Sequence, residues 1–135
     1  MKIAIIYNNN KKSVTLAEEL RKLCQKNQLV IDEKKPNVVI TIGGDGTLLS
    51  AFHRYAHLLD EVRFVGVHTG HLGFYTDWRD YELEELVASL VTDEGESVSY
   101  PLLDVEVCYQ NQPEKSTVCR IKRIYLKAGW WNYGL

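Results

Sequence analysis

Residues 38–49 read VVITIGGDGTLL and decide the fold of the chain around them. The five residues 38–42 are all β-branched, which is expected of a strand that is covered on both faces. Three glycines then surround Asp45, and a helical pattern begins at Thr47. Because Gly43, Gly44 and Gly46 lack a Cβ atom, a ligand can approach the backbone closely there.

The same alternation of strand and helix extends along residues 1–92. Strands are predicted at 2–7, 38–42 and 63–67. A capping box formed by Thr15 and Glu18 predicts the start of the first helix, and further helices are predicted over 47–59 and 81–91. Alternating strands and helices imply βαβ units, and therefore an α/β fold with a parallel sheet.

The glycine turn has the chemistry of a phosphate site with an added carboxylate. A helix N-terminus offers unpaired N–H groups and partial positive charge, and in α/β sheets ligands bind at the carboxyl ends of the strands. Residues 43–47 match neither the G-x-x-x-x-G-K-[ST] loop nor the G-x-G-x-x-G fingerprint. An ionised Asp45 could accept the proton of a substrate hydroxyl, or bind a ribose hydroxyl or a metal-bound water. The alternative is a plain turn in which Asp45 is the N-cap of the helix.

A second glycine-spaced loop, HTGHLGF at 68–74, follows the next predicted strand. The parallel arrangement predicts that both loops flank one crevice. Gly70 and Gly73 permit close approach there, and Phe74 could offer an apolar face to a base. The alternative is that Phe74 covers the core while the glycines form turns.

Composition restricts the classes of partner. The 135 residues are 45% hydrophobic and 25% charged, with a formal net charge of −2, which gives no nucleic-acid footprint. The apolar stretches are too short to span a bilayer, and the N-terminus lacks the pattern of a signal peptide. The cytoplasm is therefore expected. Cys24, Cys108 and Cys119 are widely spaced, which argues against a disulfide framework and against a zinc knuckle. Cys24 lies on the apolar side of the first predicted helix and is expected to be buried.

The four histidines raise the alternative of a metal site. His53 and His57 are four residues apart on a predicted helix, and His68 and His71 lie in the second loop. No His-Glu-x-x-His pattern accompanies them, so no metal-ligating residue is assigned.

Three segments together resemble the ATP-NAD kinase family: GGDGT at 43–47, HTGHLGF at 68–74 and YPLLDVEV at 100–107. The resemblance covers residues 1–119. It implies transfer of the γ-phosphoryl group of ATP to the adenosine ribose 2′-hydroxyl of NAD, which forms NADP, with Mg²⁺ or another divalent cation.

The resemblance also implies roles for individual residues and an assembly. Asp45 matches the aspartate that acts as general base or orients the hydroxyl. Gly46, Leu49 and Phe74 match positions that line the dinucleotide site, and Gly43, Gly44 and Thr47 complete the nucleotide-binding turn. An N-terminal α/β domain, a β-rich C-terminal domain, and homodimers or homotetramers are implied.

Two other functions remain as alternatives. Lipid kinases of the diacylglycerol and sphingosine type carry a similar glycine turn, although the acidic segment 81–96 gives no support to a membrane-facing surface. A non-catalytic remnant that binds nucleotide, or binds nothing, is the other.

The predicted division of the chain is an α/β domain over 1–95, the start of an all-β domain over 96–119, and an out-of-frame tail over 120–135. The tail has four basic residues, two tryptophans and no acidic residue. The family motif A-L-N-E-S-T is expected at this point and is absent. RIKRIYLKAG can be encoded by CGC ATT AAA CGA ATC TAC CTT AAA GCG GGN. Read from its second base, that string gives A-L-N-E-S-T-L-K-R, so a frameshift near residue 120 would explain the foreign composition.

Overall fold

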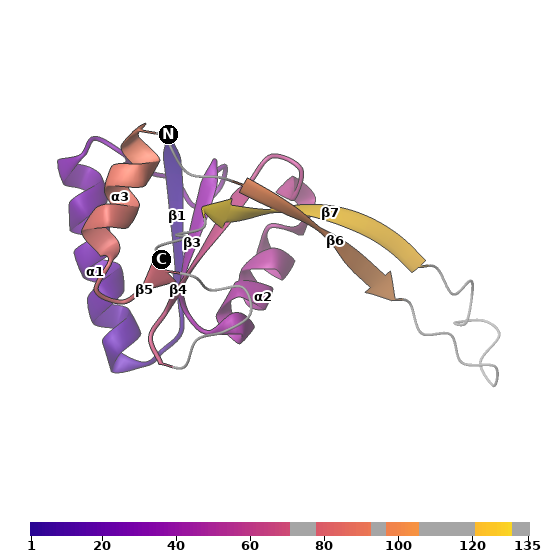
Figure 1. Cartoon of the computed structure of the whole chain (residues 1–135), viewed down its shortest axis with the longest axis horizontal. Coiled ribbons are helices and arrows are strands. Elements are labelled where there is room, and N and C mark those ends of the chain that lie inside the picture. Colours follow the sequence, from indigo (N-terminus) through magenta and orange to yellow (C-terminus); the bar gives the residue numbers. More distant parts are fainter. Residues whose placement is uncertain (71–77, 93–96, 106–120, 131–135) are drawn as a thin grey trace.

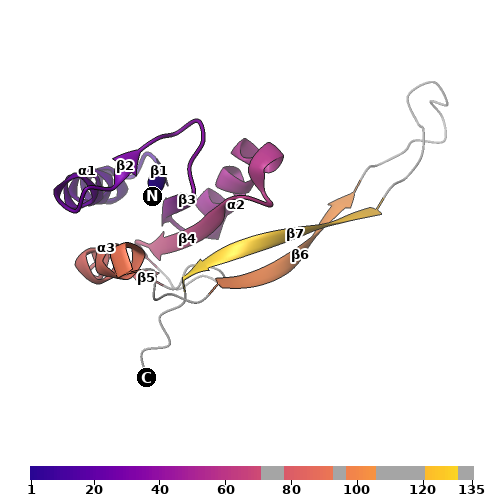
Figure 2. The ribbon, with the colours of Figure 1, turned by 90° about the horizontal axis from the view of Figure 1, so that it is seen from above.

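A parallel sheet with helices on both faces forms the body of the protein (Figures 1 and 2). The computed structural model describes residues 1–70, 78–92, 97–105 and 121–130. The strands of the main sheet are β1 (Lys2–Tyr7), β2 (Val30–Ile31), β3 (Val38–Gly43), β4 (Arg63–His68) and β5 (Trp78–Arg79). They are all parallel, in the order β2-β1-β3-β4, with β5 paired to the end of β4. The predicted α/β fold with a parallel sheet is confirmed.

β3 lies at the centre of the sheet because its residues can be buried on both faces. All six residues of the strand are buried. The hydroxyl of Thr41 donates a hydrogen bond to the Val65 carbonyl oxygen at 3.4 Å, so this buried polar group has a partner. The alternating side chains of β3 divide between two cores: Val38, Ile40 and Ile42 enter one, and Val39 enters the other. A continuous β-branched run is therefore the sequence signature of this position.

The helices cover opposite faces of the sheet, as the view from above shows (Figure 2). α1 (Lys11–Lys26) and α3 (Leu83–Thr92) pack over one face. α2 (Asp45–Arg54) and the short 3₁₀ helix η1 (Ala56–Leu58) cover the other, where the rings of Phe52 and Phe64 meet edge to face at 4.7 Å. Burial on both faces supplies the hydrophobic stabilisation of the domain.

Two helices begin earlier than the sequence predicts. α1 is capped by Asn10, whose side chain accepts a hydrogen bond from the Lys12 N–H at 3.0 Å. The Thr15 capping box is therefore wrong: Thr15 lies inside the helix and donates its hydroxyl to the Lys11 carbonyl oxygen. α2 begins at Asp45 rather than Thr47 and ends at Arg54, after which the chain tightens into η1.

Cys24 lies in the core between α1 and the sheet, as predicted, and is fully buried. Burial raises the pKa of its thiol to about 11. The thiol is therefore protonated and unreactive at neutral pH. Cys108 and Cys119 lie outside the described residues.

The last two described strands extend the sheet beyond β4. β6 (Ser97–Val105) pairs antiparallel with β7 (Ile121–Trp130). β7 also pairs in parallel with the beginning of β4, at Arg63 and Phe64. The pair forms a long ribbon that projects from the body of the domain (Figure 1). The division at residues 95 and 119 stays a prediction.

The buried side of α1 offers a direct test of the packing between this helix and the sheet. Leu20 is fully buried, with 0% of its surface accessible to water. Leu20→Ala should therefore lower the free energy of unfolding by about 2–5 kcal/mol. Leu49→Ala is the matched control, because the same substitution on α2 removes a side chain that is 46% exposed and should cost less than about 1 kcal/mol. Urea denaturation monitored by circular dichroism measures both, and equal losses would contradict the packing.

Candidate functional site

The glycine turn joins the end of β3 to the start of α2 at the carboxyl edge of the sheet. Gly43 has a φ of +154°, a conformation that residues with a side chain rarely adopt. A Cβ atom at Gly43 would overlap the Thr47 hydroxyl and lie 3.0 Å from Nδ2 of Asn8. Glycine is therefore required here by backbone conformation and by space.

Gly44 and Gly46 differ from Gly43 in what surrounds them. Among the described residues, a Cβ atom at either position would meet no atom within 4 Å beyond its chain neighbours and its own helix backbone. Gly44 is the N-cap of α2 and supplies no side-chain hydrogen bond to the first turn. The beginning of α2 is therefore open to a ligand, and its partial positive charge favours an anion.

Asp45 is the first residue of α2 and is half-buried. Since Gly44 occupies the N-cap, the alternative in which Asp45 caps the helix is wrong. Its carboxylate is held beside the helix N-terminus, where negative charge is stabilised. The position is suited to accepting a hydrogen bond from a ligand hydroxyl.

The ends of the neighbouring strands converge on this turn. At the end of β1, the Asn8 N–H donates to the Ile42 carbonyl oxygen at 3.3 Å. At the end of β4, the Thr69 N–H donates to the Gly43 carbonyl oxygen at 3.2 Å, and His68 is the register partner of Gly43. These bonds hold three parallel strands in line, so their loops share one edge of the sheet.

An ion pair closes one side of this edge. Lys12, in the first turn of α1, contacts the carboxylate of Asp80, which follows β5. The Lys12 ammonium is the main cause that lowers the pKa of Asp80 below its usual value, and His68 adds a smaller attraction. The pair joins α1 to the segment that returns from the second loop.

Two buried side-chain polar atoms have no hydrogen-bond partner in the part of the chain that the structure describes: Oγ of Ser13 and Nε2 of His68. Ser13 lies in α1 and is fully buried. His68 lies at the strand end next to the glycine turn. Buried polar atoms are normally paired, so the unpaired Nε2 next to the turn is available to a ligand or to a water molecule.

The structure brings most of the predicted site residues together. Gly43, Gly44, Asp45, Gly46 and Thr47 form the turn and the first residues of α2, and Leu49 follows on α2 with its side chain 46% exposed. Phe74 lies outside the described residues. The sequence analysis missed Asn8 and the interaction of Lys12 with Asp80, although Asn8 directly follows a predicted strand, which is a usable signal.

The histidines do not form a metal centre within the described residues. Among them, no group of three or more His, Cys, Asp or Glu side chains could hold a metal ion. His53 lies on α2 but His57 lies in η1, so the helical spacing expected of that pair is wrong. His71 lies outside the described residues.

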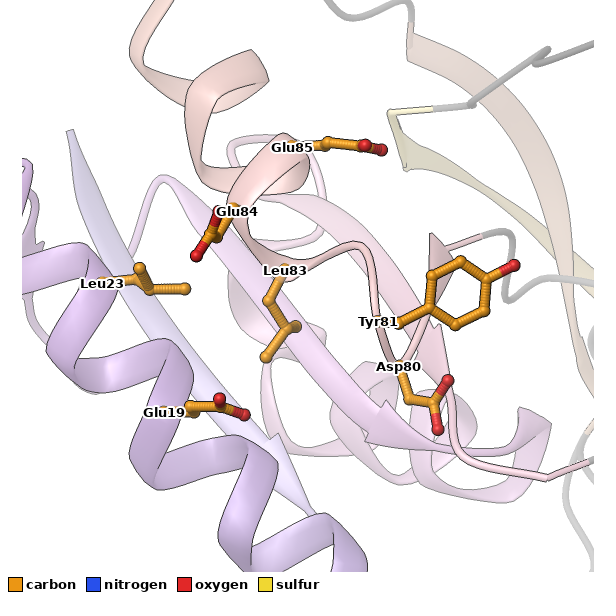
Figure 3. Close-up of a pocket in the computed structure, with 7 residues that line it drawn as sticks. All are labelled: Glu19, Leu23, Asp80, Tyr81, Leu83, Glu84 and Glu85. Atoms are coloured by element: carbon orange, nitrogen blue, oxygen red, sulfur yellow. The ribbon is translucent and has the colours of Figure 1, made fainter.

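A cavity lies elsewhere, between α1 and α3 (Figure 3). It has a volume of about 310 Å³ and is lined by Glu19, Leu23, Asp80, Tyr81, Leu83, Glu84 and Glu85. Its four carboxylates would repel phosphate groups. The glycine turn, rather than this cavity, is therefore the candidate nucleotide site. No helix in the described part of the chain is long and apolar enough to cross a membrane.

The chain thus combines a parallel α/β sheet with an Asp-bearing glycine turn at its carboxyl edge, which is the arrangement of an α/β domain with a strand-turn-helix site. Residues 25–95 match the family model of the ATP-NAD kinase N-terminal domain, and the chain belongs to this family. The predicted resemblance is therefore confirmed.

Relatives named NAD kinase match over most of the chain. The chain is 58% identical to the protein of Enterococcus faecalis over 116 residues, which cover 85% of this chain and 44% of that protein. It is 59% identical to that of Lacticaseibacillus paracasei over 109 residues, covering 81% and 41%. The chain thus spans less than half the length of the curated relatives it matches.

A solved structure supports the fold. Yeast NADH kinase, in a crystal structure complexed with NADH, matches 95% of this chain and 44% of its own chain, with a TM-score of 0.63 and 11% sequence identity. At this identity the match concerns the fold alone.

The two glycines of the turn give a matched pair of variants. Gly43→Ala should lower the free energy of unfolding by about 1–3 kcal/mol, because it combines a strained φ with displacement of Thr47. Gly46→Ala lies in open space within α2 and should raise it by up to about 1 kcal/mol. Thermal and urea unfolding measure both changes. A Gly43→Ala protein as stable as the wild type would contradict the geometry of the turn.

Proposed function

We propose that this chain is the N-terminal part of an NAD kinase, which transfers the γ-phosphoryl group of ATP to the adenosine ribose 2′-hydroxyl of NAD. The observation that carries the proposal is the position of Asp45, at the first residue of α2 and two residues after strand β3 ends. Membership of the ATP-NAD kinase family supports it, and so do the relatives named NAD kinase. The relatives named above do not support the lipid kinase alternative.

The proposed chemistry assigns one role to each part of the turn. Asp45 orients the ribose 2′-hydroxyl and accepts its proton as the oxygen attacks the γ-phosphorus of ATP, and ADP leaves. Gly44 and Gly46 let phosphate groups approach the backbone, where the N-terminus of α2 stabilises their charge. In phosphoryl transfer such positioning and charge stabilisation supply most of the catalysis.

The remaining binding residues follow from the same arrangement. Thr47 is half-buried beside Gly43 and supports the shape of the turn. Leu49 offers exposed apolar surface on α2 next to the turn. Phe74, placed by the resemblance alone, completes the proposed dinucleotide site.

We expect a divalent cation, in the first place Mg²⁺, to be held mainly by the phosphates of ATP rather than by several protein side chains. Mg²⁺ is usually held by substrate phosphates with only one or two carboxylates and several waters. The single carboxylate of Asp45 could bind a metal-bound water, in keeping with the lack of any ligand cluster among the described residues. When bound, the cation would neutralise charge on the phosphates.

The proposed division of the chain includes an out-of-frame tail over residues 120–135. A restored frame would replace these residues, including those of β7, with the A-L-N-E-S-T motif, whose asparagine and glutamate would hold NAD. Resequencing the gene, with mass spectrometry of the C-terminal peptide of the cellular protein, tests this directly. A cellular peptide ending in WWNYGL would exclude a sequence error.

The cellular setting is proposed as the cytoplasm, since the buried thiol of Cys24 suits a reducing compartment. The complete protein is proposed to assemble as a homodimer or homotetramer, which sedimentation velocity of the frame-restored protein would measure. The remnant alternative differs in one respect: it predicts no NADP formation by the 135-residue chain.

Substitution of Asp45 tests the proposed role. Asp45→Asn in the frame-restored protein should lower kcat by roughly 10²–10⁴-fold, because the amide cannot accept the proton. Asp60→Asn is the matched control, since Asp60 is exposed after η1 and should leave activity unchanged. A coupled assay of NADP formation measures both. Full activity of Asp45→Asn would contradict the assigned role.

A further inference from the structure

His68 occupies the strand end beside the glycine turn. It is the last residue of β4 and the register partner of Gly43, the last residue of β3. Paired residues on parallel strands point to the same face of the sheet, and alternation from Phe64 places His68 on the face covered by α2. The His68 side chain therefore lies on the face from whose edge α2 begins.

The ring of His68 carries an unused hydrogen-bonding atom. Its Nε2 is shielded from water and has no hydrogen-bond partner among the described residues. A buried polar atom without a partner loses its bonds to water and gains nothing in exchange. A ligand that forms a hydrogen bond at this position would supply the missing partner.

An imidazole nitrogen that carries a proton donates a hydrogen bond, and phosphate oxygens only accept one. A donor next to a helix N-terminus is suited to a phosphate oxygen, and phosphate is also what the opening of α2 favours.

We propose that Nε2 of His68 donates a hydrogen bond to a phosphate oxygen of the nucleoside triphosphate bound at the start of α2. His68 is then a phosphate-binding residue, held in place by its pairing with Gly43. The inference rests on the proposed function, because it takes the triphosphate to be the phosphoryl donor of that reaction. The competing ligand for the same atom is a ribose hydroxyl of NAD, and the experiment separates the two.

Nitrogen NMR of the histidine rings tests the contact in the 135-residue chain. The protein is labelled with ¹⁵N-histidine and titrated separately with ATP, inorganic triphosphate and NAD. The His68 signal is identified by its loss in the His68→Gln variant. We expect its Nε2 resonance to move with ATP and with inorganic triphosphate, while that of the exposed His53 stays unchanged.

Calorimetric titration of three variants measures what the contact contributes. His68→Ala should weaken ATP binding about tenfold, the loss expected for one hydrogen bond to a charged group. His68→Gln, which keeps an N–H donor near the position of Nε2, should bind within about threefold of the wild type. His53→Ala is the matched control on α2 and should bind ATP normally.

The outcomes separate this inference from the proposed function. Unchanged ATP affinity in His68→Ala, or a His68 signal that moves with NAD but not with triphosphate, would overturn the inference and leave the proposed function standing. A wild-type chain, folded by circular dichroism, that binds neither ATP nor NAD would overturn both for this chain. If His68→Ala and His68→Gln weakened ATP binding equally, the N–H donor would contribute nothing, and the inference would be overturned.

Discussion

The missing Cβ of Gly43 is the constraint on which the site depends. At a φ of +154° the chain leaves the central strand with the Thr47 hydroxyl placed where a side-chain carbon would otherwise stand. This close approach brings the first turn of α2 directly over the end of β3, so that Asp45 follows the strand by only two residues. A larger residue at position 43 would push the helix away, and with it the carboxylate and the N-terminal N–H groups.

The rest of the domain holds that turn in place. β3 is buried along its whole length between two cores, and hydrogen bonds from Asn8 and Thr69 fix the ends of the flanking strands to it. The ion pair of Lys12 with Asp80 adds a link between α1 and the segment after β5. Packing therefore supplies a rigid edge, while the ligand-facing side of the turn stays open at Gly44 and Gly46. Phosphoryl transfer is catalysed mainly by positioning the reacting groups, which requires a rigidly held turn whose ligand-facing side is open.

Local patterns predicted the parts of this architecture that depend on local chemistry. The β-branched run at 38–42 specified a central strand, and the glycines around Asp45 specified the turn, because burial and conformational freedom are readable from residue type. The start of α1 was missed because Asn10 and Thr15 are both acceptable caps and only tertiary packing chooses between them. The sequence places His68 in the second loop, whereas the structure makes it the last residue of β4, because its pairing with Gly43 is a non-local property. The strand over 121–130 was not predicted either, because it depends on pairing with β4 and β6.

The most direct test of the central claim is a crystal structure of the frame-restored protein with NAD bound. The account predicts that the adenosine ribose 2′-hydroxyl lies within hydrogen-bond reach of the Asp45 carboxylate, about 2.6–3.2 Å between oxygens, at the opening of α2. A ribose bound with that hydroxyl out of reach of Asp45, or NAD bound in the acidic cavity between α1 and α3, would contradict it.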